Sequence, residues 1–265
     1  MSTLQNKIIK SIKTHILQLS HKAKSSHIGG CLSIVEILVV LFNSILRKTS
    51  VKRKFKDTFI LSKGHACLAL YCILFEKGIL SKKTLLSYGE NNTLLMSHAS
   101  HHVPGIKFST GSLGHGLPVA IGSALSAKKD KNNRKVFVLI SDGELNEGTT
   151  WEALMFAAHH KLNNLCVIID YNKLQSLTFV SETIKIEPLI KKISSFGCDV
   201  KNINGHNILQ LKKALKLKNK NKPRVIIANT IKGKGVSFME NNIAWHYKSP
   251  NARELKKALK EVNNA

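Results

Sequence analysis

Several residue types are scarce in this chain, and each shortage argues against a class of protein. Its five cysteines, Cys31, Cys67, Cys72, Cys166 and Cys198, show no spacing typical of a metal site. No apolar run approaches the roughly 20 residues that a membrane-spanning helix needs. Internal repeats and low-complexity linkers are also missing from the sequence. We therefore expect reduced thiols in a cytoplasmic protein, with no membrane partner.

Acidic residues and arginine are scarce too, so lysine dominates the charge. The formal net charge is +25, from 41 basic and 16 acidic residues, and only five of the basic residues are arginines. A charge of this sign attracts phosphorylated ligands, and nucleic acid is the first candidate. The lysines are dispersed, however, side chains that stack on bases are few, and arginine reads bases better than lysine does. The densest basic run, residues 211–224, indicates a polar helix face followed by a turn. We therefore expect no nucleic-acid partner.

Short apolar runs indicate the strands of a buried sheet. Residues 136–140 (VFVLI), 165–169 (LCVII) and 224–229 (RVIIAN) are rich in β-branched residues, as strands covered on both faces of a parallel sheet are. Residues 59–61 predict a further short strand. Helical spacing separates these runs, so the sequence predicts an α/β fold with a parallel twisted sheet and helices on both faces. A length of 265 residues fits one domain over residues 1–265.

Apolar spacing also predicts the helices. Residues 149–160 place Trp151, Leu154, Met155 and Ala158 on one stripe, which we expect to face the core. Helices are also expected over residues 117–128, where small residues such as Gly122 permit close packing, and over residues 186–196. Ser33 and Glu36 have the spacing of a capping box at the start of another helix.

Helices are expected at both ends of the chain. The N-terminal segment, residues 1–25, is basic and free of acids, which superficially suits a transit peptide. Its stripe of isoleucine and leucine leads directly into His27, so we interpret it as a helix of the fold. An amphipathic C-terminal helix is expected over residues 251–263.

Two oxygen-bearing side chains follow neighbouring predicted strands. Asp142 comes just after residues 136–140, and Asn172 comes just after residues 165–169. A right-handed crossover brings both strand ends to one edge of the sheet, where ligands bind in open α/β folds. One carboxylate and one amide oxygen are hard ligands that suit Mg²⁺ when phosphate oxygens and water complete its shell. A turn with a capping aspartate would explain Asp142-Gly143 alone. The whole segment instead predicts a magnesium-held diphosphate.

Further motifs accompany this segment. They are Ser26-His27-Ile28-Gly29-Gly30, Leu61-Ser62-Lys63-Gly64-His65-Ala66, Pro104-Gly105, Ser109-Thr110-Gly111-Ser112-Leu113-Gly114-His115-Gly116, Lys232-Gly233-Lys234-Gly235 and Trp245-His246. Together with the magnesium segment they resemble the N-terminal, thiamine-diphosphate-binding half of transketolases, from about residue 12 to residue 250. The resemblance implies the diphosphate-binding domain of that family, with thiamine diphosphate and Mg²⁺ as cofactors and Ca²⁺ or Mn²⁺ as substitutes for the metal.

The resemblance also assigns site residues. For the metal it implies Asp142, Asn172 and the backbone carbonyl of Leu174. For catalysis it implies His27, His65, His98 and His246. For the cofactor it implies His65, Gly111, Ser112, Leu113, Gly143, Glu144, Asn172 and His246. Ser141 departs from the glycine common in the family, and His115 replaces a common glutamine. The family's Gly-His-Pro is Ser97-His98-Ala99 here, so His101 or His102 stays open for the role given to His98.

The implied reaction is cleavage of a ketose phosphate between C2 and C3, with transfer of the two-carbon unit to an aldose phosphate in the pentose phosphate pathway. The glutamate that activates the cofactor lies in the next domain of that family. We therefore expect a second chain with the pyrimidine-binding and C-terminal domains, and two copies of each chain. The alternatives are a keto-acid dehydrogenase or deoxyxylulose-phosphate synthase type of subunit, which share the magnesium segment, and a non-catalytic polyanion-binding relic. The sequence leaves the donor and acceptor sugars open.

Overall fold

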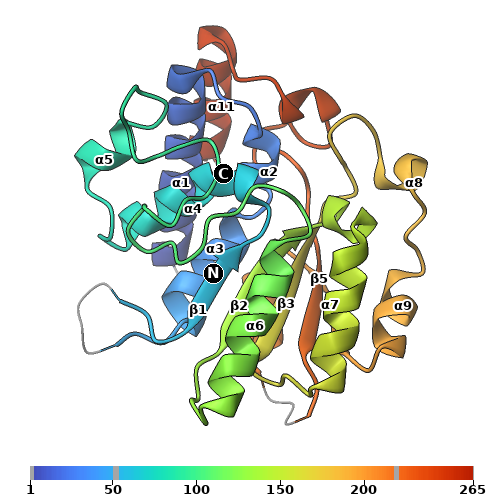
Figure 1. The fold of residues 1–265 in the computed structure, drawn as a ribbon. Coiled ribbons are helices and arrows are strands. Elements are labelled where there is room, and N and C mark those ends of the chain that lie inside the picture. The colour runs from blue at the N-terminus through green and yellow to red at the C-terminus, as the bar shows by residue number, and fades with distance from the viewer. Residues whose placement is uncertain (1–2, 50–53, 218–220, 265) are drawn as a thin grey trace.

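A five-stranded parallel sheet forms the centre of the molecule (Figure 1). The computed structural model describes residues 3–49, 54–217 and 221–264. The strand order is β1-β2-β3-β5-β4. The strands are β1 (Thr58–Leu61), β2 (Val136–Ser141), β3 (Leu165–Tyr171), β4 (Asp199–Asn204) and β5 (Arg224–Asn229). The predicted α/β fold with a parallel sheet is confirmed.

Helices cover both faces of the sheet (Figure 1). One face carries α6 (Gly116–Lys129), α7 (Gly148–His159) and α9 (Leu189–Ser195). The other carries α1 (Thr3–Ala23), α2 (Ile28–Leu32), α3 (Val35–Val40), α4 (Cys67–Glu76), α10 (Ile208–Ala214) and α11 (Ala252–Asn264). Connecting segments hold α5 (Lys82–Leu86), α8 (Val180–Thr183), the π-helical turn η1 (Leu41–Ile45) and the 3₁₀ turns η2 (Gly64–Ala66), η3 (Gly143–Asn146) and η4 (Ile243–His246).

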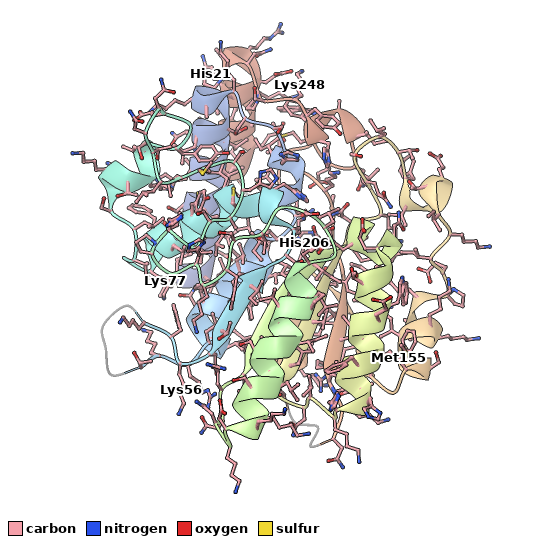
Figure 2. The ribbon with its side chains drawn as sticks, viewed as in Figure 1. His21, Lys56, Lys77, Met155, His206 and Lys248 are labelled. Carbon is pink, nitrogen blue, oxygen red and sulfur yellow. The ribbon has the colours of Figure 1, made fainter. Side chains whose placement is uncertain are left out.

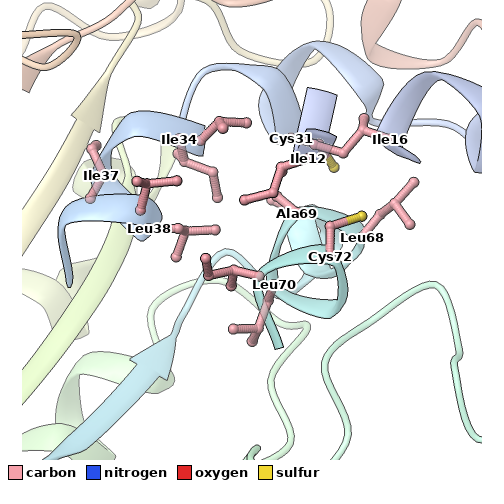
Figure 3. Close-up of a cluster of buried hydrophobic side chains, with 14 of the residues drawn as sticks. Ile12, Ile16, Cys31, Ile34, Ile37, Leu38, Leu68, Ala69, Leu70 and Cys72 are labelled. Carbon is pink, nitrogen blue, oxygen red and sulfur yellow. The ribbon is translucent and has the colours of Figure 1, made fainter. Parts of the chain in front are cut away.

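Successive residues of each strand belong to opposite cores, because side chains alternate across a strand. In β2, Phe137 and Leu139 join the cluster beneath α1, α3 and α4, whereas Val138 and Ile140 join the cluster beneath α6 and α7. Figure 3 shows part of the first cluster, in which side chains of α1, α3 and α4 meet. The strands are therefore buried on both faces, as their uninterrupted apolar runs predicted.

One stretch of the first core is long and apolar enough to cross a membrane by length and composition. Residues Ile28–Ile45 have a mean hydropathy of 2.1 over 18 residues. The expectation that no run approaches this length was therefore wrong for this segment. It passes through α2, α3 and η1, and 83% of it is buried inside the fold, as the core helix of a globular protein is.

Helix α7 forms where the sequence placed it, but its buried stripe differs from the prediction. Ala153 and Leu154 are buried, whereas Met155 is 55% exposed and labelled in Figure 2. Trp151 donates its indole N–H to the Leu145 carbonyl at 2.8 Å at the start of the helix. The small side chains on the sheet side let the helix lie close to the sheet, and this turns Met155 outward.

The predicted capping box at the start of α3 was wrong. The Ser33 hydroxyl donates to the Gly30 carbonyl and to the Asp170 carboxylate, and Glu36 contacts Lys13 and His206. Neither side chain caps the helix, whose N-cap is Ile34. Hydrogen bonds to charged groups are stronger than neutral ones, so these partners hold the two side chains away from the helix end.

Three smaller expectations also differ from the structure. The helix predicted over residues 186–196 begins only at Leu189, because proline disfavours helical geometry in the residue before it, here Glu187. Strand β4 was not predicted because it is an edge strand with mostly polar, partly exposed residues. Gly122 is exposed on α6, and nothing lies within 4 Å of where a Cβ would stand, so it permits no close packing.

Candidate active site

The carboxyl ends of β2 and β3 open into a cleft of about 150 Å³. Its walls come from five loops, those after β1, β2, β3 and β5 and the one before α6, together with the start of α2 and the turn η4. The lining residues are His27, Gly30, Lys63, His65, Leu113, Ser141, Asp142, Gly143, Asn172, Leu174, Gln175, Ser176, Lys232 and His246. The cleft therefore brings together most of the residues that the sequence assigned to cofactor, metal and catalysis.

Asp142 and Asn172 both line this cleft. The Asp142 carboxylate accepts hydrogen bonds from the backbone N–H of Gly143 at 2.9 Å and from that of Lys173 at 2.7 Å. The amide oxygen of Asn172 accepts from the Leu174 N–H at 3.1 Å. These bonds connect the segment after β2 to the segment after β3. Asp142 and Asn172, which the strand pattern predicted to lie close together, are therefore in neighbouring segments.

The oxygen donors of this turn fit a hard divalent cation. Asp142 is only 2% exposed, and burial together with the neighbouring Asp170 charge raises the pKa of its carboxyl to about 7. Asn172 and Leu174 add an amide and a carbonyl oxygen at the same cleft wall. A carboxylate, an amide oxygen and a carbonyl are the ligands that Mg²⁺ accepts when phosphate and water complete its shell. The residues therefore fit the implied metal.

A buried ion pair contributes to the cleft lining through Lys63. Lys63, 1% exposed, contacts the Asp170 carboxylate at 2.5 Å. Asp170 also accepts from the Ser33 and Thr230 hydroxyls and from the Asn172 amide. Burial would raise the pKa of Asp170, but the Lys63 charge and these hydrogen bonds hold it below its ordinary value. The pair fixes the orientation of Asn172, and the sequence analysis assigned no role to either member.

Three predicted histidines, His27, His65 and His246, line the cleft together and form what we call the histidine wall. The ring centroid of His27 lies 5.0 Å from that of His65 and 4.9 Å from that of His246. His27 has a φ of 70°, in the left-handed region that only a few per cent of non-glycine residues adopt. Its backbone N–H donates to the His246 carbonyl at 2.6 Å, which joins the start of α2 to η4. The backbone thus holds two of these rings together.

The histidine wall is neutral at physiological pH. Burial, together with nearby positive groups, lowers the pKa of His27 to about 4 and that of His246 to about 3. The same two causes, with Lys63 as the largest charge effect, hold the pKa of His65 well below its ordinary value. Neutral imidazoles can both donate and accept hydrogen bonds, which suits contact with the hydroxyl groups of a sugar.

Of the three histidines considered for the loop role, His98 lies nearest the others. Its ring centroid is 6.3 Å from that of His27, although it does not line the cleft itself. A Cβ on Gly111 would stand 3.2 Å from the His98 ring, so the glycine-rich turn packs against this histidine. His101 bonds to Ser109 instead and stacks on exposed His102. The geometry favours His98.

Glu144 does not face the cleft. Its carboxylate is fully buried and accepts from the Ser62 hydroxyl, from the Gly114 N–H at 3.1 Å and from the Ser141 N–H at 2.9 Å. The side chain therefore gives no support to the cofactor role that the resemblance implies for Glu144, and that role stays a prediction. The carboxylate instead holds the Gly111–Gly116 turn, of which Leu113 alone lines the cleft, while Ser112 is exposed.

Lys232, like Lys63, lines the cleft but received no role in the sequence analysis. Its amine donates to the carbonyls of Leu174 at 3.1 Å and Gln175 at 2.8 Å, and to Nδ1 of His246 at 2.9 Å. Burial and the neighbouring Lys63 charge lower the pKa of Lys232 to about 8. Each carbonyl has two lone pairs, so the Leu174 oxygen can still bind a cation. The sequence signal for Lys232 was the Lys232-Gly233-Lys234-Gly235 motif, but the motif did not indicate a role for the lysine.

Comparison with known proteins decides the family. A family model described as "Transketolase, thiamine diphosphate binding domain" matches residues 4–263. The chain belongs to the transketolase family. The description of the matching model also supports the predicted thiamine diphosphate site, and the predicted resemblance to the N-terminal half of transketolases is confirmed.

Relatives of similar length are named as single subunits of transketolases. The chain is 40% identical over 256 residues to an apulose-4-phosphate transketolase subunit of Phocaeicola vulgatus, and the match covers 95% of this chain and 91% of that protein. It is 37% identical over 241 residues to "6-deoxy-6-sulfo-D-fructose transketolase subunit SqwG" of a Clostridium species, and this match covers 89% of this chain and 88% of that protein.

Solved transketolases share the fold but are much longer. The crystal structure of transketolase from Campylobacter jejuni superposes with a TM-score of 0.88 at 28% identity, covering 98% of this chain. This chain spans only 42% of the length of that protein. The fold described here therefore corresponds to one part of that longer, single-chain transketolase.

Proposed function

We propose that this chain is the cofactor-binding subunit of a two-subunit transketolase, which transfers a two-carbon ketol unit from a ketose phosphate to an aldose phosphate. The observation that carries the proposal is the convergence of His27, His65 and His246 with Asp142 and Asn172 in one cleft of a transketolase-family fold. A keto-acid enzyme would need the diphosphate segment but not this wall of neutral histidines.

The cleft residues divide into two groups in this proposal. Asp142, Asn172 and the Leu174 carbonyl hold Mg²⁺, and the backbone at Gly143 leaves room for a diphosphate, since the nearest atoms to an added Cβ there lie 3.8 Å away. Bound thiamine diphosphate supplies the carbon nucleophile and stores the electron pair of the cleaved bond. The +25 net charge attracts both the cofactor and phosphorylated sugars.

The histidines position hydroxyl groups and move their protons. Lys232 donates to Nδ1 of His246, because a lysine ammonium has no acceptor, so the His246 ring carries its proton on Nε2. Nδ1 of His27 is bonded to the Ser26 hydroxyl at 2.8 Å, which leaves its Nε2 for a ligand. Together with His65, these rings offer donors and acceptors that stay neutral at pH 7 and can shuttle protons on substrate hydroxyls.

A partner chain completes the site in this proposal. Relatives named as subunits match nearly the whole chain, whereas the Campylobacter jejuni transketolase is more than twice as long. According to the resemblance, the glutamate that activates the cofactor lies in the part of the longer transketolase that this chain does not match. Leu177 and Tyr247 are 78% and 59% exposed within two residues of cleft-lining residues, and exposed apolar side chains of this size support a protein contact at the cleft mouth. We expect two copies of each chain in the assembly.

The substrates and compartment are further parts of the proposal. Sugar phosphates of the pentose phosphate pathway are the expected substrates, although the two relatives are named for apulose-4-phosphate and a sulfofructose. The contacts that select the sugar phosphate belong mostly to the partner. The five cysteines are free and buried, which supports the reducing cytoplasm as the compartment.

Ketol transfer by the reconstituted enzyme tests this function. Purified chain with thiamine diphosphate, Mg²⁺, a ketose phosphate and an aldose phosphate is expected to show no turnover alone. Adding the glutamate-bearing subunit from the same organism should produce the new ketose and aldose. Robust transfer by the single chain would overturn the split arrangement. Turnover of pyruvate in place of every ketose phosphate would overturn the transketolase assignment in favour of a keto-acid enzyme.

A further inference from the structure

The loop between β5 and η4, residues 230–242, carries Lys232 into the cleft. Two backbone bonds hold its middle: the Gly233 N–H donates to the Gly29 carbonyl at 2.9 Å, and the Asn241 N–H donates to the Lys232 carbonyl at 2.9 Å. Because a lysine side chain is long and flexible, the position of its amine depends on how firmly the backbone on both sides of it is held.

A line of buried polar groups leads to this loop from helix α1. Lys13 of α1 donates to the Glu36 carboxylate of α3 at 2.7 Å, and the other oxygen of Glu36 lies 2.9 Å from Nδ1 of His206. Nε2 of His206 accepts the backbone N–H of Ile231 at 2.9 Å. Lys13 and Glu36 are only 7% and 5% exposed and the His206 side chain is 13% exposed, so the Lys13–Glu36 contact is shielded from water.

The geometry fixes the protonation of His206. The Ile231 N–H is a donor, so Nε2 must present a lone pair and carry no proton. In a neutral ring the proton is then on Nδ1, where it is donated to Glu36. Glu36 is ionised, since it accepts from both His206 and Lys13. Each group in the line therefore specifies the orientation of the next.

Lys13 also lies beside the same loop at Gly235. A Cβ on Gly235 would stand 3.2 Å from the Lys13 amine, and Gly235 has a φ of 98° that favours glycine. The line thus contacts the loop at Ile231 and at Gly235, on either side of Lys232. Lys232 in turn bonds to the Leu174 and Gln175 carbonyls on the metal side of the cleft and to His246 on the histidine side.

We infer that Lys13, Glu36 and His206 are positioning residues, which fix the 231–235 loop and thereby the placement of Lys232 between the two walls of the cleft. The inference rests on the proposed function, because it concerns how a cofactor cleft is held in shape. None of the three residues lines the cleft, so none touches cofactor or substrate. Figure 2 labels His206, which lies between β4 and α10.

Two substitutions of His206 separate the bond to Ile231 from the bond to Glu36. His206→Asn keeps a donor near the Nδ1 position but cannot reach Ile231, whereas His206→Gln places an oxygen near the Nε2 position. In the cofactor-free protein, His206→Asn should speed hydrogen exchange of the amides of residues 231–235 about tenfold, as for one lost hydrogen bond. His206→Gln should restore most of the protection. The matched control is His15→Asn, since His15 is a part-buried histidine bonded only within α1.

Cofactor affinity provides the second readout. Calorimetry of thiamine diphosphate with Mg²⁺ should show about tenfold weaker binding to His206→Asn and near-normal binding to His206→Gln, with unchanged exchange of β3 amides in both. Unchanged exchange at residues 231–235 in His206→Asn would overturn the inference, as would equal losses in the two variants. If the unaltered chain binds no thiamine diphosphate, the proposed function fails, while the exchange data still decide the positioning role.

A nitrogen-15 spectrum of the unaltered protein tests the same geometry without a substitution. We expect a His206 ring protonated on Nδ1 and bare on Nε2. A ring with its proton on Nε2 would contradict the bond from Ile231 and overturn the inference.

Discussion

At the scale of single residues, several buried charges in this fold are paired, whereas Asp142 at the cleft is not. Lys63 pairs with Asp170, and Lys13 pairs with Glu36. In the part of the chain that the structure describes, no lysine, arginine or histidine forms an ion pair with buried Asp142, which accepts only backbone N–H groups. Burying an unpaired charge is costly in free energy. Binding of a cation should therefore stabilise buried Asp142 more than it would stabilise an exposed carboxylate.

Glu36 should make stability depend on pH in a defined window. Burial raises the pKa of its carboxyl, but the His206 hydrogen bond and the Lys13 charge together hold the pKa below the ordinary 4.5. A carboxyl whose folded pKa is lowered adds stability above the unfolded value, and this is lost as pH falls through the folded value. Glu36→Gln leaves Lys13 buried without a counter-charge and should lower the free energy of unfolding by about 3 kcal/mol at pH 7.

Urea denaturation at several pH values checks this prediction. The difference between the unaltered protein and Glu36→Gln should stay constant above about pH 5 and shrink as the pH falls below 4.5. A difference that does not change over this range would show that Glu36 is not ionised in the folded protein. Glu261→Gln is the surface control, because that carboxylate bonds only to exposed Ser237.

The sequence predicted which residues meet at the cleft better than it predicted their partners. Asp142 and Asn172 could be brought together because each follows a strand, and parallel strands end at one edge. Lys232 and Asp170 could not be assigned a role, since their roles depend on contacts with residues far away in the chain. A motif shows that a lysine is near a site, but only the fold shows which atoms its amine reaches.

At the scale of elements, close backbone contacts at glycine position the turn before α6. A Cβ on Gly116 would stand 2.8 Å from Ser62 Cα, and one on Gly114 would stand 2.8 Å from Glu147 Cβ. These approaches bring the Gly111–Gly116 turn against the end of β1, where the Glu144 carboxylate bonds to it. The turn is therefore set by shape as well as by hydrogen bonds.

Gly116→Ala should destabilise the protein by about 2 kcal/mol, because the methyl group overlaps the Ser62 backbone and the chain must shift. Gly122→Ala is the control in the same helix, since nothing lies within 4 Å of its Cβ position. That change should raise stability by roughly 1 kcal/mol through helix propensity. Thermal denaturation checks both. Equal effects of the two substitutions would contradict the close approach at Gly116.

Element prediction succeeded where burial is complete and failed where it is partial. β2, β3 and β5 are buried on both faces, and their continuous apolar runs indicated this in advance. Edge strand β4 has few apolar residues, so its sequence shows no regular alternation of apolar and polar residues. The buried face of α7 was misjudged because alanine and methionine fit an apolar stripe equally, and only the distance to the sheet decides which turns inward.

At the scale of the whole molecule, we propose that the chain provides one side of a reaction site. Its cleft lies at the carboxyl edge of the sheet, where five loops and two helical segments converge. The fold matches 98% of this chain to only 42% of a single-chain transketolase. Diphosphate and metal binding are therefore expected from this chain alone, whereas ketol transfer is expected only with its partner.

Binding of thiamine diphosphate to the isolated chain is the most direct test of this division. Titration calorimetry should show binding that requires Mg²⁺ and disappears with a chelator. Asp142→Ala should abolish the metal-dependent binding while keeping the thermal unfolding transition, and Asp130→Ala, at an exposed aspartate after α6, should change neither. Equal affinity with and without Mg²⁺, or unchanged affinity in Asp142→Ala, would contradict the proposed metal and diphosphate site in the cleft.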